Sequence, residues 1–291
     1  AVFCVTTGTA ANALAMSALC PPWGAIYCHE GAHIQNDENT AVELYTGGAR
    51  MVGIAGDGGK PDILVMRSHM EIATVHGVHN AKPGAISLSN VTESGTVYRP
   101  EEVAGYRQLA DEFQLNLHMD GARFANSVVA SGVSPADVTW RAGIDCLSFG
   151  LTKNGGIATE AVVMFNSALA EDFAYRRKRA GHLWSKQRFL AAQWLALLEN
   201  DLWLDNARHA NAMARELAAG FAAHDAIRLP WPVDANELFP VIPEMLRRQL
   251  RESGLAFYDW PQEAGMTRFV TNFGTDPAEV ARALEVIAAS Q

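Results

Sequence analysis

A lysine in a small, glycine-rich loop is the residue of this sequence best suited to covalent chemistry. Lys153 follows the apolar run Cys146–Phe149 and lies between Gly150 and the pair Gly155-Gly156. A lysine next to a buried strand loses hydration, which lowers its pKa and permits imine formation with a carbonyl group. A solvated surface lysine is the ordinary alternative. The flanking glycines and the apolar strand favour the catalytic interpretation, with Lys153 as a Schiff-base lysine.

An acidic residue follows another apolar run. Asp120 comes after Leu115–His118 and before Gly121, with Arg123 close behind. A carboxylate at the end of a strand could hold the proton of a pyridinium ring, which keeps such a cofactor an electron sink. An N-cap of the following helix is the alternative. This segment alone leaves both interpretations open.

A glycine–threonine turn lies near the start of the chain. Gly8 and Thr9 follow the run Val2–Val5 and open an alanine-rich helix predicted over Ala10–Leu19. Backbone N–H groups, a hydroxyl and the positive end of a helix dipole can together bind a phosphate. An ordinary N-cap by threonine is the alternative, and the turn by itself favours it.

A histidine and an arginine complete the candidate side chains. His33, with Asp37 close behind it, could stack on a flat cofactor or move a proton near neutral pH, although a lone histidine is more often structural. Arg268, within Met266–Val270, could bind a carboxylate through two parallel hydrogen bonds. A surface ion pair on an edge strand explains this arginine equally well in isolation.

Short apolar runs alternate with helix-patterned segments and bring these candidates to strand ends. Strands are predicted at Val2–Val5, Ala25–Tyr27, Met51–Ile54, Ala85–Leu88, Leu115–His118, Cys146–Phe149 and Ala161–Phe165. Between them lie helical patterns such as Pro100–Phe113, which begins with proline and two glutamates. This alternation predicts an α/β fold with a mainly parallel sheet covered on both faces. Ligands of such sheets collect beyond the carboxyl ends of the strands.

The rest of the chain has a different pattern. From Trp184 to about Ala223 the sequence is almost wholly helical, as expected of a bridge between domains. Shorter elements follow, predicted at Glu237–Val241, Pro243–Ser253, Ala256–Asp259 and Arg268–Asn272, with a closing helix from Asp276. We therefore expect a large domain over residues 1–200 and a small α+β C-terminal domain over residues 201–291. Because the chain enters a strand at once and lacks an initial methionine, we expect a native N-terminal segment to be missing from it.

Composition excludes several classes of function. Hydrophobic residues make up 49% of the 291 residues and charged residues 19%, which is typical of a compact globular protein. A net charge of −9 argues against a nucleic-acid-binding surface, and no run of apolar residues is long enough to span a membrane. The four cysteines form no CxxC pair, so the sequence predicts no metal site and reduced thiols in a cytoplasmic protein.

Taken in order, these segments resemble the low-specificity L-threonine aldolases of the β-eliminating lyase family over nearly the whole chain. The two most specific matches are His118–Arg123, with Phe124 and Asn126, and Ser148–Gly155 around the lysine. Three further segments match as well: Thr7–Asn12, Glu30–His33 and Leu88–Val97. In the third of these, Glu93 stands where many members of the family carry a histidine.

The resemblance implies the aspartate-aminotransferase fold, fold type I of the enzymes that use pyridoxal 5′-phosphate (PLP). It also implies retro-aldol cleavage of L-threonine or L-allo-threonine to glycine and acetaldehyde. Lys153 would hold the cofactor, Asp120 would pair with its ring nitrogen, and Gly8 and Thr9 would bind its phosphate. His33 would stack on the cofactor ring, and Arg123 would lie beside the cofactor. Arg123 and Arg268 would together bind the substrate carboxylate, and Lys178 would be a further active-site cation. For the base that takes the β-hydroxyl proton, His33 is the first candidate and Glu93 or Asp37 the second.

Other functions on the same scaffold remain open. Phenylserine aldolase and another β-eliminating lyase of fold type I are the nearest alternatives, and an inactive PLP-binding subunit is a third. The resemblance further implies a homo-oligomer, a tetramer or a dimer, that acts on a small amino-acid substrate and needs no nucleic acid or membrane.

Overall fold

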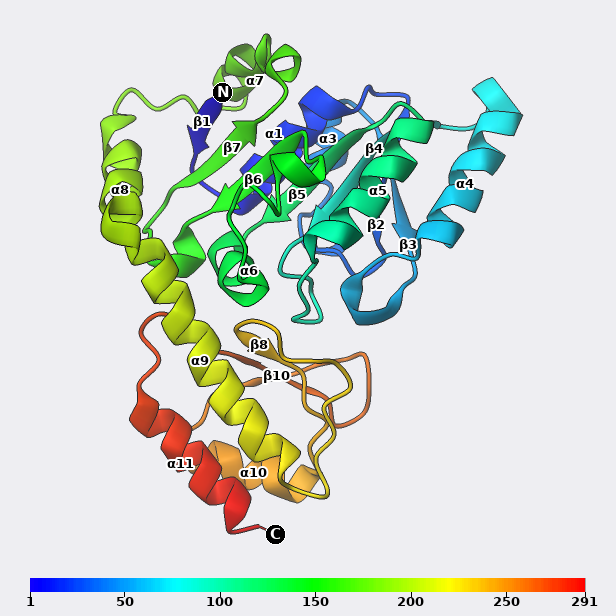
Figure 1. Ribbon diagram of the computed structural model, residues 1–291. Helices are drawn as coiled ribbons and strands as arrows, with labels where there is room; N and C mark the ends of the chain where they lie inside the picture. The colour runs from blue at the N-terminus through cyan, green and yellow to red at the C-terminus, as the bar shows by residue number, and fades with distance from the viewer. Residues whose placement is uncertain (291) are drawn as a thin grey trace.

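The structure is a computed structural model that describes residues 1–290. It has a larger part, at the top of Figure 1, and a smaller part, at the bottom. The larger part contains the strands β1 (Val2–Val5), β2 (Gly24–His29), β3 (Arg50–Ile54), β4 (Lys82–Ser89), β5 (Asn116–Gly121), β6 (Cys146–Gly150) and β7 (Glu160–Met164). They form one seven-stranded sheet in the order β1-β7-β6-β5-β4-β2-β3. From β3 to β6 neighbouring strands are parallel, whereas β7 is antiparallel to β6, and β1 to β7. The mainly parallel mixed sheet confirms the predicted α/β class.

Each predicted strand of this sheet is present, with ends that differ by at most three residues. The end of β5 matters most, because Asp120 and Gly121 lie inside the strand rather than after it. Asp120 pairs with Ser89 of β4 on one side and with Ser148 of β6 on the other. Backbone hydrogen bonds to two neighbouring strands thus outweigh the low strand propensity of aspartate.

Helices cover both faces of the large sheet. One face packs against α1 (Gly8–Leu19), α3 (Ala41–Thr46) and α7 (Phe173–Arg179), and the other packs against α4 (Ile63–His76), α5 (Pro100–Glu112) and α6 (Phe124–Ser131). Side chains alternate along β5, so that Leu117 and Met119 enter the core beneath α4 and α5. The same alternation turns Asp120 towards α1.

Helices α8 (Arg188–Leu198) and α9 (Leu202–Ala222) lead from the larger to the smaller part. The nearly continuous helix predicted from Trp184 is wrong in two places. The chain is not helical before Arg188, and it breaks at the turn Glu199–Asp201. Asn200 and Asp201 have φ values of 54° and 59° there, a left-handed conformation that asparagine and aspartate adopt more readily than most residues.

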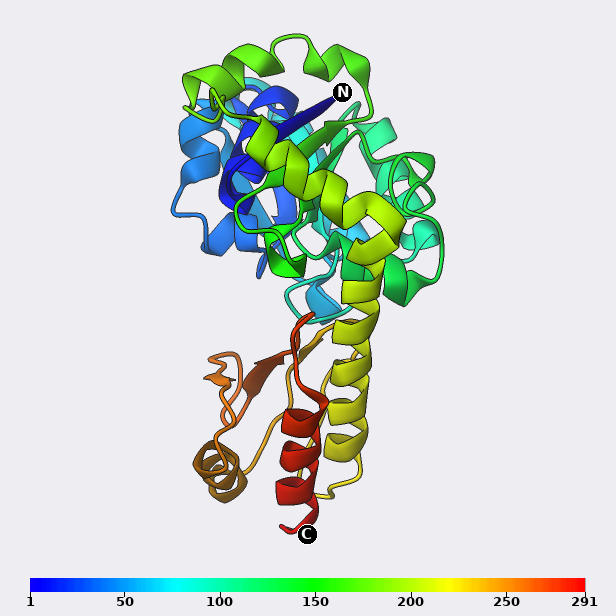
Figure 2. The same ribbon diagram turned by 90° about the vertical axis from the view of Figure 1, so that its left-hand side faces the viewer.

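The smaller part is α+β, as the sequence predicts. Its strands β8 (Glu237–Leu238), β9 (Tyr258–Asp259) and β10 (Thr267–Val270) form an antiparallel sheet in the order β8-β10-β9. Helices α10 (Glu244–Glu252) and α11 (Pro277–Ala288) pack with the second half of α9 around one hydrophobic core. Helices α9 and α11 lie side by side in Figure 1 and in Figure 2. The domain boundary after residue 200 stays a prediction, consistent with the helix break at that point.

Within residues 1–290, every helix is too short or too polar to cross a membrane.

Candidate active site

A buried carboxylate marks the carboxyl end of β5. Asp120 is only 5% exposed, and its Oδ1 accepts the N–H of Ala122 at 2.9 Å. Its Oδ2 accepts Nδ2 of Asn12, from α1, at 2.8 Å. Asn12 is itself buried, and its Oδ1 has no hydrogen-bond partner among the described residues. A neutral amide from α1 therefore fixes the orientation of the predicted ring-nitrogen carboxylate.

The same amide reaches a second carboxylate, which in turn reaches the predicted histidine. Nδ2 of Asn12 also donates to Oε1 of Glu38 at 2.8 Å, and Nδ1 of His33 lies 3.0 Å from that oxygen. The hydrogen bond to Glu38 is the largest cause of a raised pKa of His33, and the charge of Asp120 adds to it. Burial and the charge of Lys153 act in the opposite direction. Asp120, Asn12, Glu38 and His33 thus form one connected network.

The structure places Glu38 rather than Asp37 beside His33. Asp37, the predicted second-choice base, is exposed, whereas Glu38 is buried and bonded to His33. Helix α2 (His33–Asn36) is a single turn, and the chain then bends through Asn39 and Thr40, both with positive φ. No local sequence pattern predicts this bend, so the sequence does not show that Glu38 turns inward and Asp37 outward.

Lys153 lies in a short 3-10 turn (Thr152–Asn154) directly after β6. Its side chain is exposed to solvent, yet partial burial is the largest cause of a lowered pKa, followed by the charge of Arg123. The carboxylates of Asp120, Glu237 and Glu160 act in the opposite direction. Lys153 is therefore within electrostatic range of Asp120, which is the juxtaposition that the sequence predicts.

Hydrogen bonds hold the lysine loop on both sides. The carboxylate of Glu160, in β7, accepts the N–H of Leu151 at 2.6 Å and the hydroxyl of Thr152. Nδ2 of Asn154 donates to the carbonyl of Trp203, in α9, at 2.7 Å. The lysine between these anchors consequently has a defined backbone position.

The glycine–threonine turn caps α1 and leaves space in front of it. Oγ1 of Thr7 accepts the N–H of Ala10 at 3.1 Å, so Thr7 is the N-cap of α1, as the alternative interpretation predicts. A Cβ added at Gly8 would meet no atom within 4 Å. The first N–H groups of a helix have no partner inside the helix. The N-cap thus leaves Gly8 and Thr9 available to an anion.

A second titratable group lies beside His33. Oε1 of Glu93 accepts the backbone N–H of His33 and the hydroxyl of Ser89, both at 2.8 Å. Its Oε2 is shielded from solvent and has no hydrogen-bond partner among the described residues. Burial raises the pKa of Glu93 to about 7. The group therefore changes charge near neutral pH.

The two predicted carboxylate-binding arginines meet across the two parts of the molecule. Arg123 precedes α6 in the larger part, and Arg268 lies in β10 of the smaller part. Both lie 3.0 Å from the same oxygen, Oε1 of Glu237, Arg123 through Nη2 and Arg268 through Nε. Glu237 was not foreseen as part of the site.

The structure does not bring Lys178 to these residues. Lys178 is exposed on α7, which lies at the far end of the larger part from the small sheet (Figure 1). Its neighbour Arg177 points inward, donates to the carbonyl of Cys4 at 3.3 Å and lies over the ring of Phe3. Successive side chains of a helix diverge by about 100°, so a one-residue difference in position decides which cation faces the sheet.

Comparisons with known proteins show which proteins this chain resembles. The family model described as beta-eliminating lyase matches residues 1–244. A relative from Pseudomonas sp. (strain NCIMB 10558), named low specificity L-threonine aldolase, is 42% identical over 96% of this chain and 80% of its own. A relative of the same name from Pseudomonas aeruginosa is 44% identical over 94% of this chain and 79% of its own.

Solved structures give the same result. A threonine aldolase from Leishmania major superposes with a TM-score of 0.92 at 29% identity, covering 100% of this chain and 84% of that one. A PLP-dependent aminotransferase from Streptococcus suis has a TM-score of 0.70 at 17% identity, over 99% of this chain and 76% of that one. The second likeness concerns the fold alone and confirms the aminotransferase-like architecture. From the family model and these relatives together, the chain belongs to the β-eliminating lyase family.

Proposed function

We propose that this chain is a PLP-dependent aldolase that cleaves L-threonine, L-allo-threonine and similar β-hydroxy-α-amino acids into glycine and an aldehyde. The names of relatives that are 42% and 44% identical support this reaction. The observation that carries the proposal is the juxtaposition of Lys153, whose pKa is lowered, with the buried carboxylate of Asp120. A carbon–carbon lyase that uses PLP needs both groups at one place.

The residues present fit PLP. Lys153 is suited to hold its aldehyde carbon, Asp120 its ring nitrogen, and Gly8 with Thr9 its phosphate. The buried atoms Oδ1 of Asn12, Oε2 of Glu38 and Oε2 of Glu93 lack hydrogen-bond partners among the described residues, as expected where a polar group is to be bound. His33 would stack on the ring and Arg123 would lie beside it. When bound, PLP supplies an electron sink for the carbon that loses a bond.

The arginine pair is proposed to orient the substrate. Arg123 and Arg268 both contact one carboxylate oxygen of Glu237, so their guanidinium groups lie close together. A substrate carboxylate bound by both arginines beside Glu237 has restricted rotation about its Cα. This restriction decides which of the bonds to Cα is aligned for cleavage.

The base for the β-hydroxyl proton comes from the neighbourhood of His33. The sequence ranks His33 first, but its hydrogen bond to Glu38 raises its pKa and so stabilises the imidazolium form, which is less suited to accept a proton. Glu93 has a pKa of about 7 and a carboxyl oxygen without a partner among the described residues, so we rank it as the stronger candidate. Asp37 is exposed to solvent, which does not favour this role.

A product analysis tests the proposed reaction. The protein supplied with PLP is incubated with L-threonine, L-allo-threonine and phenylserine, and glycine, aldehyde and ammonia are quantified. Equal amounts of glycine and acetaldehyde from either threonine are expected. Ammonia in place of glycine would identify a β-eliminating lyase, and cleavage of phenylserine alone would identify a phenylserine aldolase. A protein that retains PLP and releases neither product would be the inactive binding subunit.

We further propose a cytoplasmic homo-oligomer, a tetramer or a dimer. Cys4, Cys20, Cys28 and Cys146 are free thiols, as expected of a reducing compartment. Exposed apolar side chains such as Phe189, Leu195 and Leu198 gather on α8 and are suited to a subunit contact. Light scattering of the purified protein measures the assembly directly, and a monomer at working concentration would contradict it.

A further inference from the structure

One buried carboxylate is shared by two arginines at the junction of the two parts. Glu237 has a side chain that is only 2% exposed, against 13% for Arg123 and 23% for Arg268. Oε1 of Glu237 lies 3.0 Å from Nη2 of Arg123 and accepts a hydrogen bond from Nε of Arg268 at 3.0 Å. No other carboxylate of the described residues forms an ion pair with either arginine. Two positive charges and one negative charge leave the cluster with a net charge of +1.

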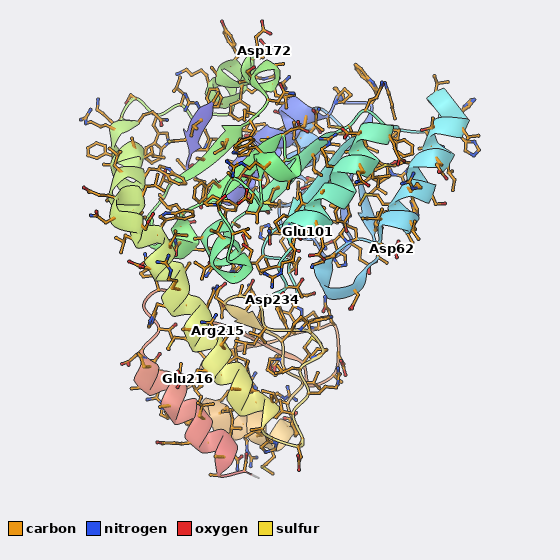
Figure 3. The ribbon with its side chains drawn as sticks, viewed as in Figure 1. Asp62, Glu101, Asp172, Arg215, Glu216 and Asp234 are labelled. Atoms are coloured by element: carbon orange, nitrogen blue, oxygen red, sulfur yellow. The ribbon has the colours of Figure 1, made fainter. Side chains whose placement is uncertain are left out.

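The backbone of Glu237 is firmly held, so its carboxylate is a permanent member of this cluster. Glu237 pairs with Val270 between β8 and β10. A Cβ added at Gly95 would lie 2.8 Å from the carbonyl oxygen of Glu237, so the loop after β4 packs closely on it. Nearby, Asp234 accepts the N–H of Val97 at 3.0 Å and lies where the two parts meet in Figure 3. The segment before β8 is thus fixed to the larger part.

We propose that Glu237 is a specificity-determining residue, because it sets the net charge that the arginine pair offers to the substrate. The inference rests on the proposed function, in which Arg123 and Arg268 bind the substrate carboxylate. An amino acid with one carboxylate neutralises a cluster of charge +1. A second carboxylate on the β-carbon would bring another negative charge towards Glu237, and like charges repel strongly where water is scarce. The site therefore selects monocarboxylic over dicarboxylic amino acids.

The first test compares the wild type with Glu237→Gln on two substrates. L-threonine has a methyl group where L-threo-3-hydroxyaspartate has a second carboxylate. Glutamine keeps an oxygen that accepts from both arginines and removes only the charge. The ratio of kcat/KM for hydroxyaspartate to that for threonine is expected to rise about tenfold or more, since one unit charge is removed at short range. An unchanged or lower ratio would overturn the inference.

A binding test separates this inference from the proposed reaction. L-alanine and L-aspartate have no β-hydroxyl group and so cannot undergo retro-aldol cleavage. Their Kd values are measured on the PLP-loaded protein from the change in cofactor absorbance. In Glu237→Gln the Kd of aspartate relative to that of alanine is expected to fall by the same factor. If the binding ratio shifts but the wild type does not cleave threonine, the proposed reaction is contradicted and the specificity role is not. Threonine cleavage with an unshifted binding ratio would contradict the specificity role alone.

Two control variants isolate the local charge. Glu263→Gln removes the same charge from an exposed pair with Arg228, in the same part of the molecule, and is expected to leave both ratios unchanged. Glu237→Asp keeps the charge and is expected to retain the wild-type preference even if total activity falls. An equal shift in Glu263→Gln, or a dicarboxylate preference in Glu237→Asp, would overturn the inference. Thermal unfolding of each variant verifies that it is folded.

Discussion

The site has two charged regions, a carboxylate region around Asp120 and an arginine region around Glu237, and they differ in what connects their charged groups. Around Asp120, two buried carboxylates are joined by a neutral amide, since Asn12 donates to both Asp120 and Glu38. Around Glu237, two guanidinium groups are joined by one carboxylate. The first region lies within the larger part, where the family motifs are found, whereas the second bridges both parts.

The difference indicates how each region should respond to change. Loss of a neutral hydrogen-bonding partner leaves an unsatisfied buried group, at a cost of about 1–3 kcal/mol. Loss of one partner of a buried ion pair leaves an uncompensated charge, at a cost of about 3–5 kcal/mol. The carboxylate region is therefore suited to tuning proton positions, and the arginine region to selecting by charge.

Lys153 lies between the two regions, and its replacement has the largest expected effect. Its pKa is lowered by Arg123 of one region and raised by Asp120 of the other. In Lys153→Ala, threonine cleavage is expected to fall by roughly 10⁴-fold or more, the scale seen when a covalent catalytic group is removed. The visible absorbance of covalently held cofactor should disappear with it. Lys178→Ala, at an exposed lysine, is the matched control and should retain wild-type activity. Unaltered absorbance in Lys153→Ala would remove the basis of the proposed function.

Replacement of Asp120 tests the carboxylate region itself. Asp120→Asn keeps the shape but cannot hold the ring-nitrogen proton as a carboxylate does, so kcat is expected to fall by roughly 10²-fold or more. Steady-state kinetics with saturating PLP separate this loss from weak cofactor binding. Asp37→Asn, at an exposed neighbouring acid, serves as the control and should change little. If the two variants lose activity equally, the assignment of Asp120 is wrong.

Glu93 links the network to pH-dependent stability. Its folded-state pKa of about 7 lies above the ordinary value of 4.5, so the folded state binds more protons between these two pH values. Stability must then fall as pH rises through this window, by on the order of 2–3 kcal/mol from this group. Glu93→Gln should remove that fall, as measured by thermal unfolding at pH 5 and pH 8. An identical pH dependence in the variant would show that Glu93 is not the group responsible.

The smallest expected effect concerns the histidine. Glu38 raises the pKa of His33, so its contribution to stability is present below the unfolded-state pKa and is lost as pH rises through the folded-state pKa. Glu38→Gln should lower the pKa of His33, as followed by NMR of labelled histidines. His182, whose ring bonds to Thr6 elsewhere in the molecule, is the internal reference and should not shift. If the pKa of His33 is the same in Glu38→Gln as in the wild type, Glu38 does not raise it.

Several features of this protein follow from its sequence alone. Apolar runs of the right length predict the strands of the large sheet, because a strand covered on both faces needs continuous hydrophobic residues. The carboxyl ends of parallel strands meet at one edge, so Asp120 and the Lys153 loop are expected to be neighbours. Motif matches then identify the family and nominate the arginines, which the structure brings together.

Long-range packing decided what the sequence could not. Whether Asp37 or Glu38 turns inward depends on a bend with two positive φ angles and on an amide from a distant helix. Glu237 becomes the partner of Arg123 only because the smaller part docks against the larger one. Local patterns record hydrophobic periodicity and chain reversals, but the burial and pairing of a charge depend on every segment that surrounds it. For that reason Lys153 could be nominated as the Schiff-base lysine from its own loop, whereas the carboxylates around it could be placed only from the tertiary structure.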